Sequence, residues 1–371
     1  MEQNTKVHQL ALALVTGVGT SIARNLIRLT GSVSGIFREN ANALVKIPGI
    51  TERVIKQMSD GGIIRRAEEE IRFMEKEKLR MLFFTDPEYP ELLKFCQDAP
   101  LVLFVKGNLP QSMPHSLSVI GTRNPSSRGR QLTRDWVGSL AKSHNNLHII
   151  SGLAYGIDIT GHEAALENKL ITLAVLGHGF HTLYPSVHRA AAERILEKGA
   201  LITDFFSYNR REPKNFIRRN RIIAGISEAT LVIESAFKGG AMATAEMANS
   251  YDREVFTVPG RPGDETSVGC NYLIRSHQAI LVNSPDDIPF QLNWQTTNKI
   301  AFTNQQKHLS TKHDLTETQQ RIIDSLSLEA LSLDELSYQL KLLPAQLTGE
   351  LLTLEFTGLV EVAPGKRFKL L

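Results

Sequence analysis

The chain has 371 residues, a length that accommodates two or three domains with substantial buried cores. Apolar residues make up 42% of it and charged residues 22%, an ordinary globular composition that argues against a disordered, collagen-like or coiled-coil chain. Its 42 basic and 39 acidic residues leave a formal charge of only +3, so any anion-binding surface has to be local, and its 2 distant cysteines exclude a disulfide scaffold and a cysteine-based zinc site.

The chain begins with an early acidic residue and a short apolar stretch, without the A-x-A pattern of a cleavage site. This start is typical of a helix and not of a signal peptide. No apolar run approaches the roughly 20 residues that span a bilayer. We therefore expect a soluble, cytoplasmic protein.

Residues 1–75 are predicted to form short helices separated by glycine turns. Two segments, residues 16–19 and 47–50, have a glycine turn that leads into a helix, the pattern of a helix-hairpin-helix or SAM-like domain. Such a turn can present backbone N–H groups to a phosphate, or it can serve only to pack two helices. Both interpretations remain open from the sequence.

Residues 76–284 are predicted to form an extended, doubly wound (Rossmann-like) α/β domain built on a parallel sheet. Two strands joined by a proline-rich turn form an appendage at its start. The later strands alternate with stretches of helix length, and most are continuous apolar runs, as in strands that are buried on both faces. The strands are expected at 81–84, 101–105, 117–120, 147–150, 171–176, 200–203, 229–233, 254–258 and 279–282.

The polar, weakly periodic residues 285–313 are predicted to be a linker, and residues 314–371 a winged-helix-like domain of three helices and a C-terminal hairpin. The third helix, expected at 344–356, contains Glu350 and Glu355 but no Arg or Lys. A helix that reads the major groove usually carries base-contacting Arg, Lys, Asn or Gln. We therefore expect this domain to bind protein, or duplex DNA only weakly.

Ligands of doubly wound sheets bind beyond the carboxyl ends of the strands, so the loops after the strands are the candidate sites. The first such loop, residues 121–129, combines glycines, a helix start and the fork-shaped donor of Arg123, which favours a bound anion. It is neither the G-x-G-x-x-G dinucleotide motif nor a P-loop. The second loop offers the hydroxyl of Ser151 and the backbone N–H of Gly152 to the same anion.

Acidic and histidine side chains follow the second and third strands of this domain. Asp158 and His162 lie four residues apart on one helix face, where they could form a metal or acid–base pair. An anchoring aspartate and a packed histidine are favoured, because no third ligand is near in sequence. His178 and His181 likewise lack a carboxylate or cysteine at zinc-binding spacing. We expect no metal and no cofactor.

The basic island, residues 210–221, contains six basic residues and one acidic residue, so its local charge of +5 exceeds the charge of the whole chain. Basic groups bind backbone phosphates, and an interleaved aromatic such as Phe216 can stack on an unpaired base. Arg219 and Arg221 are expected at a helix edge near the ligand face of the sheet, in contact with phosphates. The alternative is a solvated charge run.

A glycine-rich loop, Lys238-Gly239-Gly240, opens another helix after the strand at 229–233 and is again suited to an anion. Several such loops therefore converge, together with arginines, on one edge of the sheet. One mononucleotide would need a single cradle, so the arrangement favours a chain of phosphates.

Together these motifs resemble the DNA-processing protein A (DprA, or Smf) family of bacteria over roughly residues 80 to 285. The resemblance is carried by the order and spacing of segments 119–123, 151–158, 216–225, 259–260 and 269–274. It implies a single-stranded DNA-binding protein of natural transformation that is not an enzyme. Such proteins form a homodimer, protect incoming strands and help to load the RecA recombinase.

The DNA-binding residues expected from the resemblance and from the glycine-rich loop form one set. They are Gly121, Thr122, Arg123, Ser151, Gly152, Phe216, Arg219, Asn220, Arg221, Lys238, Gly239 and Gly240. The sequence departs from the family pattern at four places: Thr122 replaces Ser, Gly161 replaces Ala, Ile217 replaces Pro, and Gly239-Gly240-Ala241 replaces Ser-Gly-Ser. The last change removes hydroxyl contacts from that loop and keeps its backbone contacts.

Two other functions remain as alternatives. Residues 239–246 are similar to the Gly-Gly-x-Gly-Thr and Glu motif of nucleotide phosphoribohydrolases, in which Glu246 would assist N-glycosidic cleavage. One glycine of that motif is replaced here, however, and the basic island has no use in a mononucleotide site. The second alternative is a transcription regulator that acts through the winged helix, and the acidic third helix argues against it.

Overall fold

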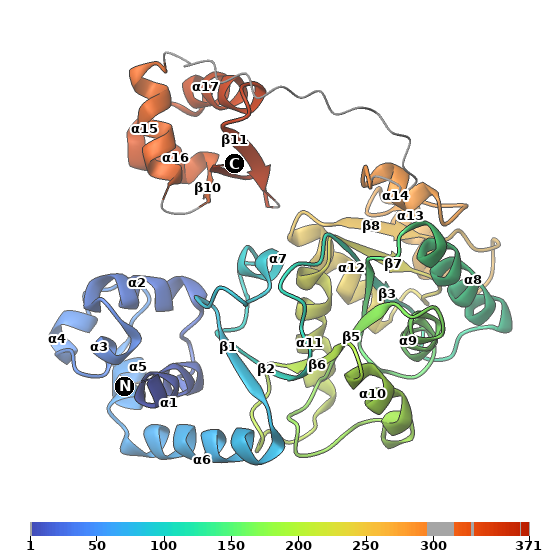
Figure 1. Cartoon of the computed structure of the whole chain (residues 1–371), viewed down its shortest axis with the longest axis horizontal. Helices are drawn as coiled ribbons and strands as arrows, with labels where there is room; N and C mark the ends of the chain where they lie inside the picture. Colours follow the sequence, from blue (N-terminus) through green and yellow to red (C-terminus); the bar gives the residue numbers. More distant parts are fainter. Residues whose placement is uncertain (1, 295–314, 328–329, 364, 371) are drawn as a thin grey trace. The chain divides into compact units, whose positions relative to one another are not determined.

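The structure, a computed structural model, describes residues 2–294, 315–327, 330–363 and 365–370 (Figure 1). The chain divides into two compact units, one within residues 1–297 and the other within residues 298–371. None of the helices in these described ranges is long and apolar enough to cross a lipid bilayer.

The first unit begins with a helical segment. Its helices are α1 (Glu2–Leu14), α2 (Thr20–Thr30), α3 (Val33–Ile36), α4 (Ala41–Leu44), α5 (Glu52–Met58) and α6 (Gly61–Glu77). The predicted glycine turns precede α2 and α5, and Gly17 and Gly49 have φ values of 95° and 87°, a region that favours glycine. The second turn packs against α2, because a Cβ atom on Gly49 would lie 2.9 Å from Cδ1 of Ile22.

A nine-stranded sheet forms the centre of the first unit, in the order β1-β2-β6-β5-β4-β3-β7-β8-β9. Its strands are β1 (Arg80–Phe83), β2 (Val102–Gly107), β3 (His115–Ile120), β4 (Leu147–Ser151), β5 (Ile171–Val175), β6 (Ala200–Thr203), β7 (Ala229–Val232), β8 (Glu254–Thr257) and β9 (Ile280–Leu281). Strands β3 to β9 pair in parallel, whereas β2 pairs antiparallel with β1 and β6. The predicted doubly wound parallel sheet is confirmed, with an antiparallel extension at one edge.

Helices cover both faces of this sheet (Figure 1). One face carries α8 (Ser127–Ser143), α9 (Ile157–Glu167) and α10 (Arg189–Leu196), and the other carries α11 (Pro213–Ile226) and α12 (Gly240–Ser250). Successive residues of β3 point to opposite faces: Val119 packs with Trp136 of α8, and Ile120 belongs to the cluster that contains Ile223 of α11. The shorter helices are α7 (Glu91–Lys94), η1 (Ser186–His188) and α13 (Val268–Arg275).

The strand order reverses at β3, because β4 lies on one side of β3 and β7 lies on the other. The chain therefore leaves the carboxyl ends of β3 and β7 toward helices on opposite faces of the sheet. Such a reversal opens a crevice between the two loops, which is the general ligand position in doubly wound folds.

The helical segment is continuous with the sheet domain. One apolar cluster extends from Leu10 of α1 through Phe104 of β2 to Ile223 of α11. Glu70 of α6, only 2% exposed, accepts hydrogen bonds from the backbone N–H (2.9 Å) and the hydroxyl (2.7 Å) of Ser207, in the loop after β6. Residue 75 therefore does not separate two independently packed cores.

The sheet domain also extends further along the chain than expected. Helix α14 (Asp287–Gln291) buries Ile288, and Trp294 packs in the same cluster while its indole N–H donates to Glu228 (2.7 Å). Residues 285–294, expected to begin the linker, belong to the sheet domain because these apolar side chains pack against it. The rest of the expected linker, residues 295–313, lies outside the described residues.

The second unit is the winged-helix domain, built of α15 (Glu317–Leu326), β10 (Leu331–Ser332), α16 (Leu333–Leu340), α17 (Pro344–Phe356), β11 (Val360–Ala363) and β12 (Arg367–Leu370). The predicted three helices and hairpin are confirmed. The short strand β10 was not predicted, and it pairs with β12 to give a three-stranded sheet. Capping boxes at Thr316 and Ser332 fix the starts of α15 and α16.

Candidate functional site

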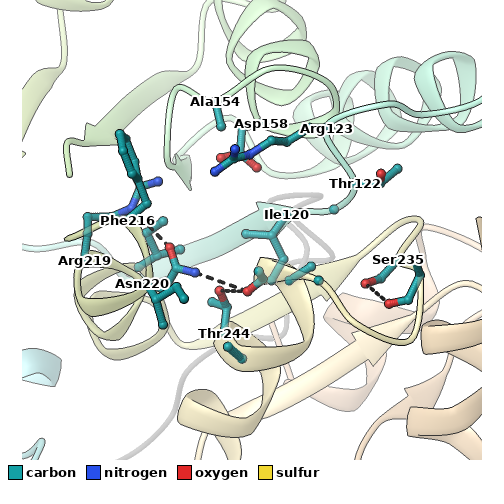
Figure 2. Close-up of a pocket in the computed structure, with 18 of the residues that line it drawn as sticks. Ile120, Thr122, Arg123, Ala154, Asp158, Phe216, Arg219, Asn220, Ser235 and Thr244 are labelled. Atoms are coloured by element: carbon teal, nitrogen blue, oxygen red, sulfur yellow. Dashed lines mark hydrogen bonds between the residues drawn. The ribbon is translucent and has the colours of Figure 1, made fainter. Parts of the chain in front are cut away.

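A pocket of about 620 Å³ lies at the carboxyl edge of the sheet, between the loops after β3 and β7 and helix α11 (Figure 2). Of the residues predicted for the site, all but Ser151, Gly152 and Arg221 line it. Those that do are Gly121, Thr122, Arg123, Phe216, Arg219, Asn220, Lys238, Gly239 and Gly240. The loops after β3 and β7 therefore meet at one edge of the sheet, where the sequence places them.

The aromatic ring of Phe216 forms part of the pocket wall and is half-buried. Its ring lies so close to the backbone after β5 that a Cβ atom on Gly177 would approach Cδ1 of Phe216 to 2.7 Å. The ring of Tyr184 lies 5.7 Å from it, and the guanidinium carbon of Arg123 lies 5.9 Å from its centroid. Sequence reasoning missed Gly177, although its position directly beyond a strand end is a usable signal.

Arg219 also lines the pocket, but its guanidinium is engaged inside the protein. The residue is 3% exposed, and Nη1 donates to the carbonyl of Gly152 (2.7 Å) and to that of Val175. Its Nε donates to Oδ1 of Asn220 (3.2 Å). Burial lowers the pKa of Arg219 to about 10, and the charge of Asp158 opposes that shift. These contacts make Arg219 a support of the pocket wall and leave little of it for a phosphate.

The loop after β4 does not offer Ser151 and Gly152 to a ligand. The hydroxyl of Ser151 donates to the carbonyl of Val119 (2.6 Å), and the N–H of Gly152 donates to Oδ2 of Asp158 (3.2 Å). A Cβ atom on Gly152 would lie 2.5 Å from Nη2 of Arg219, so glycine is required here for close approach. Both residues hold the loop in place behind the pocket.

Asp158 and His162 take the structural roles favoured by the sequence. Asp158, at the start of α9, is 8% exposed and anchors the loop after β4. Burial raises its pKa, an effect that the positive charge of Arg219 opposes. His162 is fully buried, and its Nδ1 lies 2.7 Å from the hydroxyl of Thr172.

The burial of His162 predicts a pH-dependent stability. Burial lowers the pKa of His162 to about 3, and its Nε2 has no partner in the described structure. In the unfolded chain, His162 binds a proton near pH 6.5, whereas in the folded chain it stays neutral down to about pH 3. The stability that the neutral, buried histidine contributes is therefore fully present above pH 6.5 and is lost as the pH falls from 6.5 toward 3. We expect unfolding free energies of the wild type to fall relative to His162→Asn by up to about 1.4 kcal/mol per pH unit in this window. Equal pH profiles of the two proteins would contradict this assignment.

Arg221 lies on the opposite side of α11 from Phe216. Its Nη2 donates to Oδ2 of Asp204 (2.6 Å), and Nη1 donates to the carbonyl of Asp98. The neighbouring Arg218 also pairs with Asp204, at 3.1 Å. The structure therefore does not bring Arg221 to the pocket, because a residue five positions after Phe216 is rotated to the far face of the helix.

The start of α12 is open toward the pocket. Gly239 is its N-cap residue and provides no capping side chain, and both glycines of the turn are exposed. The amide of Asn220 donates to the carbonyl of Gly240 (3.2 Å), and the hydroxyl of Thr244 donates to the same carbonyl (2.9 Å; Figure 2). The turn is thus fixed from behind while its N–H groups remain available to an anion.

The start of α8, in contrast, is occupied by a carboxylate of the protein itself. Ser126, its N-cap, donates its backbone N–H (2.9 Å) and its hydroxyl (2.5 Å) to Glu234, and a Cβ atom on Gly129 would lie 2.5 Å from the same carboxylate. The carboxylate of Glu234 therefore occupies the helix start at which the sequence predicted a bound anion. Of that loop, only the part up to Arg123 faces the pocket.

Two cationic side chains stand at the pocket mouth. Arg123 and Lys238 are both exposed, and neither forms an ion pair with any residue that the structure describes. Asp158 is the single carboxylate among the described lining residues, and it is committed to the loop after β4. Glu246, the residue that a phosphoribohydrolase reaction would use, is exposed on α12 and does not line the pocket.

Comparison with known proteins identifies relatives of both units. Residues 80–293 match the family described as DNA recombination-mediator protein A, and residues 306–366 match the DprA winged helix domain. The chain is 29% identical to the protein Smf of Synechocystis sp. over 401 aligned positions, which cover 100% of both chains.

Two solved structures are similar to this one. DNA processing protein A from Streptococcus pneumoniae aligns with 78% of this chain and 97% of its own, with a TM-score of 0.60 and 26% identity. The Helicobacter pylori protein, reported for its mode of binding single-stranded DNA, aligns with 58% of this chain and 96% of its own, with a TM-score of 0.52 and 25% identity.

Proposed function

Because the chain belongs to the DNA recombination-mediator protein A family, we propose that it binds single-stranded DNA in the pocket between the loops after β3 and β7. The observation that carries this proposal is the half-buried ring of Phe216 beside the open start of α12. A base can stack on the ring while backbone N–H groups, Arg123 and Lys238 hold the phosphates. Duplex DNA offers no unpaired base to such a ring.

We propose binding without catalysis. The pocket carboxylate, Asp158, accepts a backbone hydrogen bond and faces the charge of Arg219, so it is not free to act as a general acid or base. A phosphoribohydrolase reaction would need Glu246, which lies outside the pocket. A mobility shift with single-stranded and double-stranded oligonucleotides of one sequence, beside an assay for AMP hydrolysis, tests both statements. Hydrolysis of AMP, or equal affinity for the duplex, would contradict them.

Removal of the winged-helix domain is expected to leave most of the single-strand affinity, because every pocket residue lies in the first unit. The shortened chain should keep residues 1–297, since the helical segment shares its apolar cluster with the sheet domain. We expect a change in Kd of less than about tenfold, or roughly 1.4 kcal/mol. A larger loss would mean that the second unit contacts DNA directly.

The surface of the winged-helix domain supports a protein partner more than a DNA groove. Helix α17 carries Glu350 and Glu355 and no basic residue, while its Leu352 and Phe356 are exposed. These features do not favour a transcription regulator that reads the major groove.

We further propose that the protein acts in natural transformation as a homodimer through its sheet domain, shields incoming strands and helps to load the RecA recombinase. A shield and a loader have to cover more strand than one pocket holds. The cytoplasm is the proposed location, since both cysteines, Cys96 and Cys270, are unpaired and buried. Light scattering that finds only monomers at micromolar concentration, with and without DNA, would contradict the dimer. Unchanged RecA assembly on single strands would contradict the loading role.

A further inference from the structure

A second cleft, of about 580 Å³, lies where the helical segment meets the sheet domain. We call it the junction cleft. Its walls are the turn between α1 and α2, the loop before β2, the loop after β6 and two arginines of α11. It shares no lining residue with the pocket described above.

An aromatic ring stands at the wall of the junction cleft with about half of its surface open. Tyr208 is 52% exposed, and its ring stacks on that of Phe206 at 5.8 Å and 29°. Phe206 is itself buried and packs edge-on against Phe104 of β2 (5.2 Å). Phe206 therefore supports the ring of Tyr208 from the side of the core, and about half of the Tyr208 surface stays exposed.

The turn that carries Tyr208 is held from both sides. The backbone N–H of Phe206 donates to Oδ1 of Asn209 (2.7 Å), and the N–H of Asn209 donates back to the carbonyl of Phe206 (3.0 Å). Between them, Ser207 is bound by the carboxylate of Glu70. An exposed aromatic ring on a rigid support loses little conformational entropy on binding, which is what a stacking platform requires.

One guanidinium group of the junction cleft, that of Arg218, is largely exposed to solvent. Arg218 has 57% of its side chain exposed, and its guanidinium carbon lies 5.0 Å from the ring centroid of Phe205. Its Nη2 donates to Asp204 at 3.1 Å, and no residue in the described part of the chain accepts a hydrogen bond from its other Nη or from Nε. The other carboxylate, Asp98, accepts from the hydroxyl of Tyr251 (2.6 Å).

Helix α11 contributes residues to both the pocket and the junction cleft and has basic residues at its start. At about 100° per residue, Phe216 and Asn220 share one face, and Arg218 and Arg221 lie on the opposite face. The exposed residues Arg210, Arg211 and Lys214 lie just before and in the first turn of the helix. A chain of phosphates that crosses the start of α11 can therefore reach both the pocket and the junction cleft.

We propose that the junction cleft binds a further nucleotide of the same single strand, with its base stacked on Tyr208 and its phosphate against Arg218. This inference rests on the proposed function, because it needs a strand that already occupies the pocket at Phe216. It also gives a role to Arg218, a residue of the basic island that lies on the face of α11 away from the pocket.

The first test measures the affinity of the full-length chain for oligo-dT of increasing length, from about 3 to 20 nucleotides. We expect wild-type affinity to rise with length, and Tyr208→Ala to remove that gain, by roughly tenfold, without changing the Kd of the shortest strand that binds. Tyr208→Phe keeps the ring and should bind every length as the wild type does. Wild-type affinities of Tyr208→Ala at all lengths, or an equal loss in Tyr208→Phe, would overturn the proposal.

The second test uses the unmodified protein and does not depend on the folding of a variant. Strands that carry 5-iodo-2′-deoxyuridine at single positions are irradiated and the cross-linked peptides are identified. We expect cross-links to Phe216 from short strands, and to both Phe216 and Tyr208 from long ones. Cross-links to Phe216 alone at every length would overturn this inference and leave the proposed function standing. A wild-type chain that binds no single strand would overturn both.

Discussion

Replacement of Arg219 by alanine is expected to lower the free energy of unfolding of the sheet domain by about 1–3 kcal/mol for each buried carbonyl that loses its hydrogen-bond donor. The variant would leave the carbonyls of Gly152 and Val175 without their donor, and it would remove a positive charge that acts on the buried carboxylate of Asp158. Denaturant unfolding followed by tryptophan fluorescence measures this directly. Both tryptophans, Trp136 and Trp294, lie in one core cluster of the sheet domain.

The matched controls are Asp158→Asn and the double variant. Because the second substitution removes the charge that the first leaves uncompensated, the double variant should lose less stability than the sum of the two single variants. If Arg219 instead contacted a phosphate, as the sequence suggested, its replacement would change DNA binding and leave the stability unchanged. That role would be supported by an Arg219→Ala variant of wild-type stability whose DNA affinity depends less steeply on salt.

Replacement of Phe216 by alanine is expected to weaken binding of single-stranded DNA by about 1–3 kcal/mol, the range of a base–aromatic stack. The dependence of log K on log salt should stay unchanged, because the ring carries no charge and releases no counterion. The loss should be much smaller on duplex DNA, in which the bases are already stacked. Fluorescence anisotropy titrations at several salt concentrations measure all three quantities.

Arg123→Ala provides the comparison for this measurement. Arg123 is exposed at the pocket mouth, so we expect its removal to weaken binding about equally for all sequences and to reduce the salt slope by roughly 0.7 on single strands. If Phe216→Ala changed the slope and Arg123→Ala did not, the roles assigned to the ring and the cation would be wrong. If neither variant changed binding, the site would lie elsewhere.

Much of the fold could be predicted because its strands are short apolar runs buried on both faces. Each strand of the main sheet lies within a few residues of its expected position, even two-residue β9. Helix α14 could not be predicted in this way, since it has five residues and its burial depends on Trp294, three positions after its end. Strand β10 has two residues and exists only through its pairing with β12, near the end of the chain.

The position of the site could be predicted from the general geometry of parallel sheets, but the roles of the individual site residues could not be predicted. Loops beyond parallel strands share one edge, so Gly121, Phe216 and Gly240 were expected together. The direction of each arginine depends on contacts that the sequence does not show. Arg219 is on the face of Phe216 but turns inward to carbonyls of two other segments, and Arg221 pairs with Asp204 on the far face.

The carboxylate of Glu234 has a consequence for the ligands that this fold can accept. In dinucleotide-binding relatives of the doubly wound architecture, the helix after the first parallel strand receives the pyrophosphate of the cofactor. In this chain, that position faces a negative charge held by Ser126. A pyrophosphate placed there would meet like charge and would have to displace two hydrogen bonds. The chain thus keeps the architecture of a cofactor-binding domain, but a carboxylate of its own occupies the helix start that would receive the pyrophosphate.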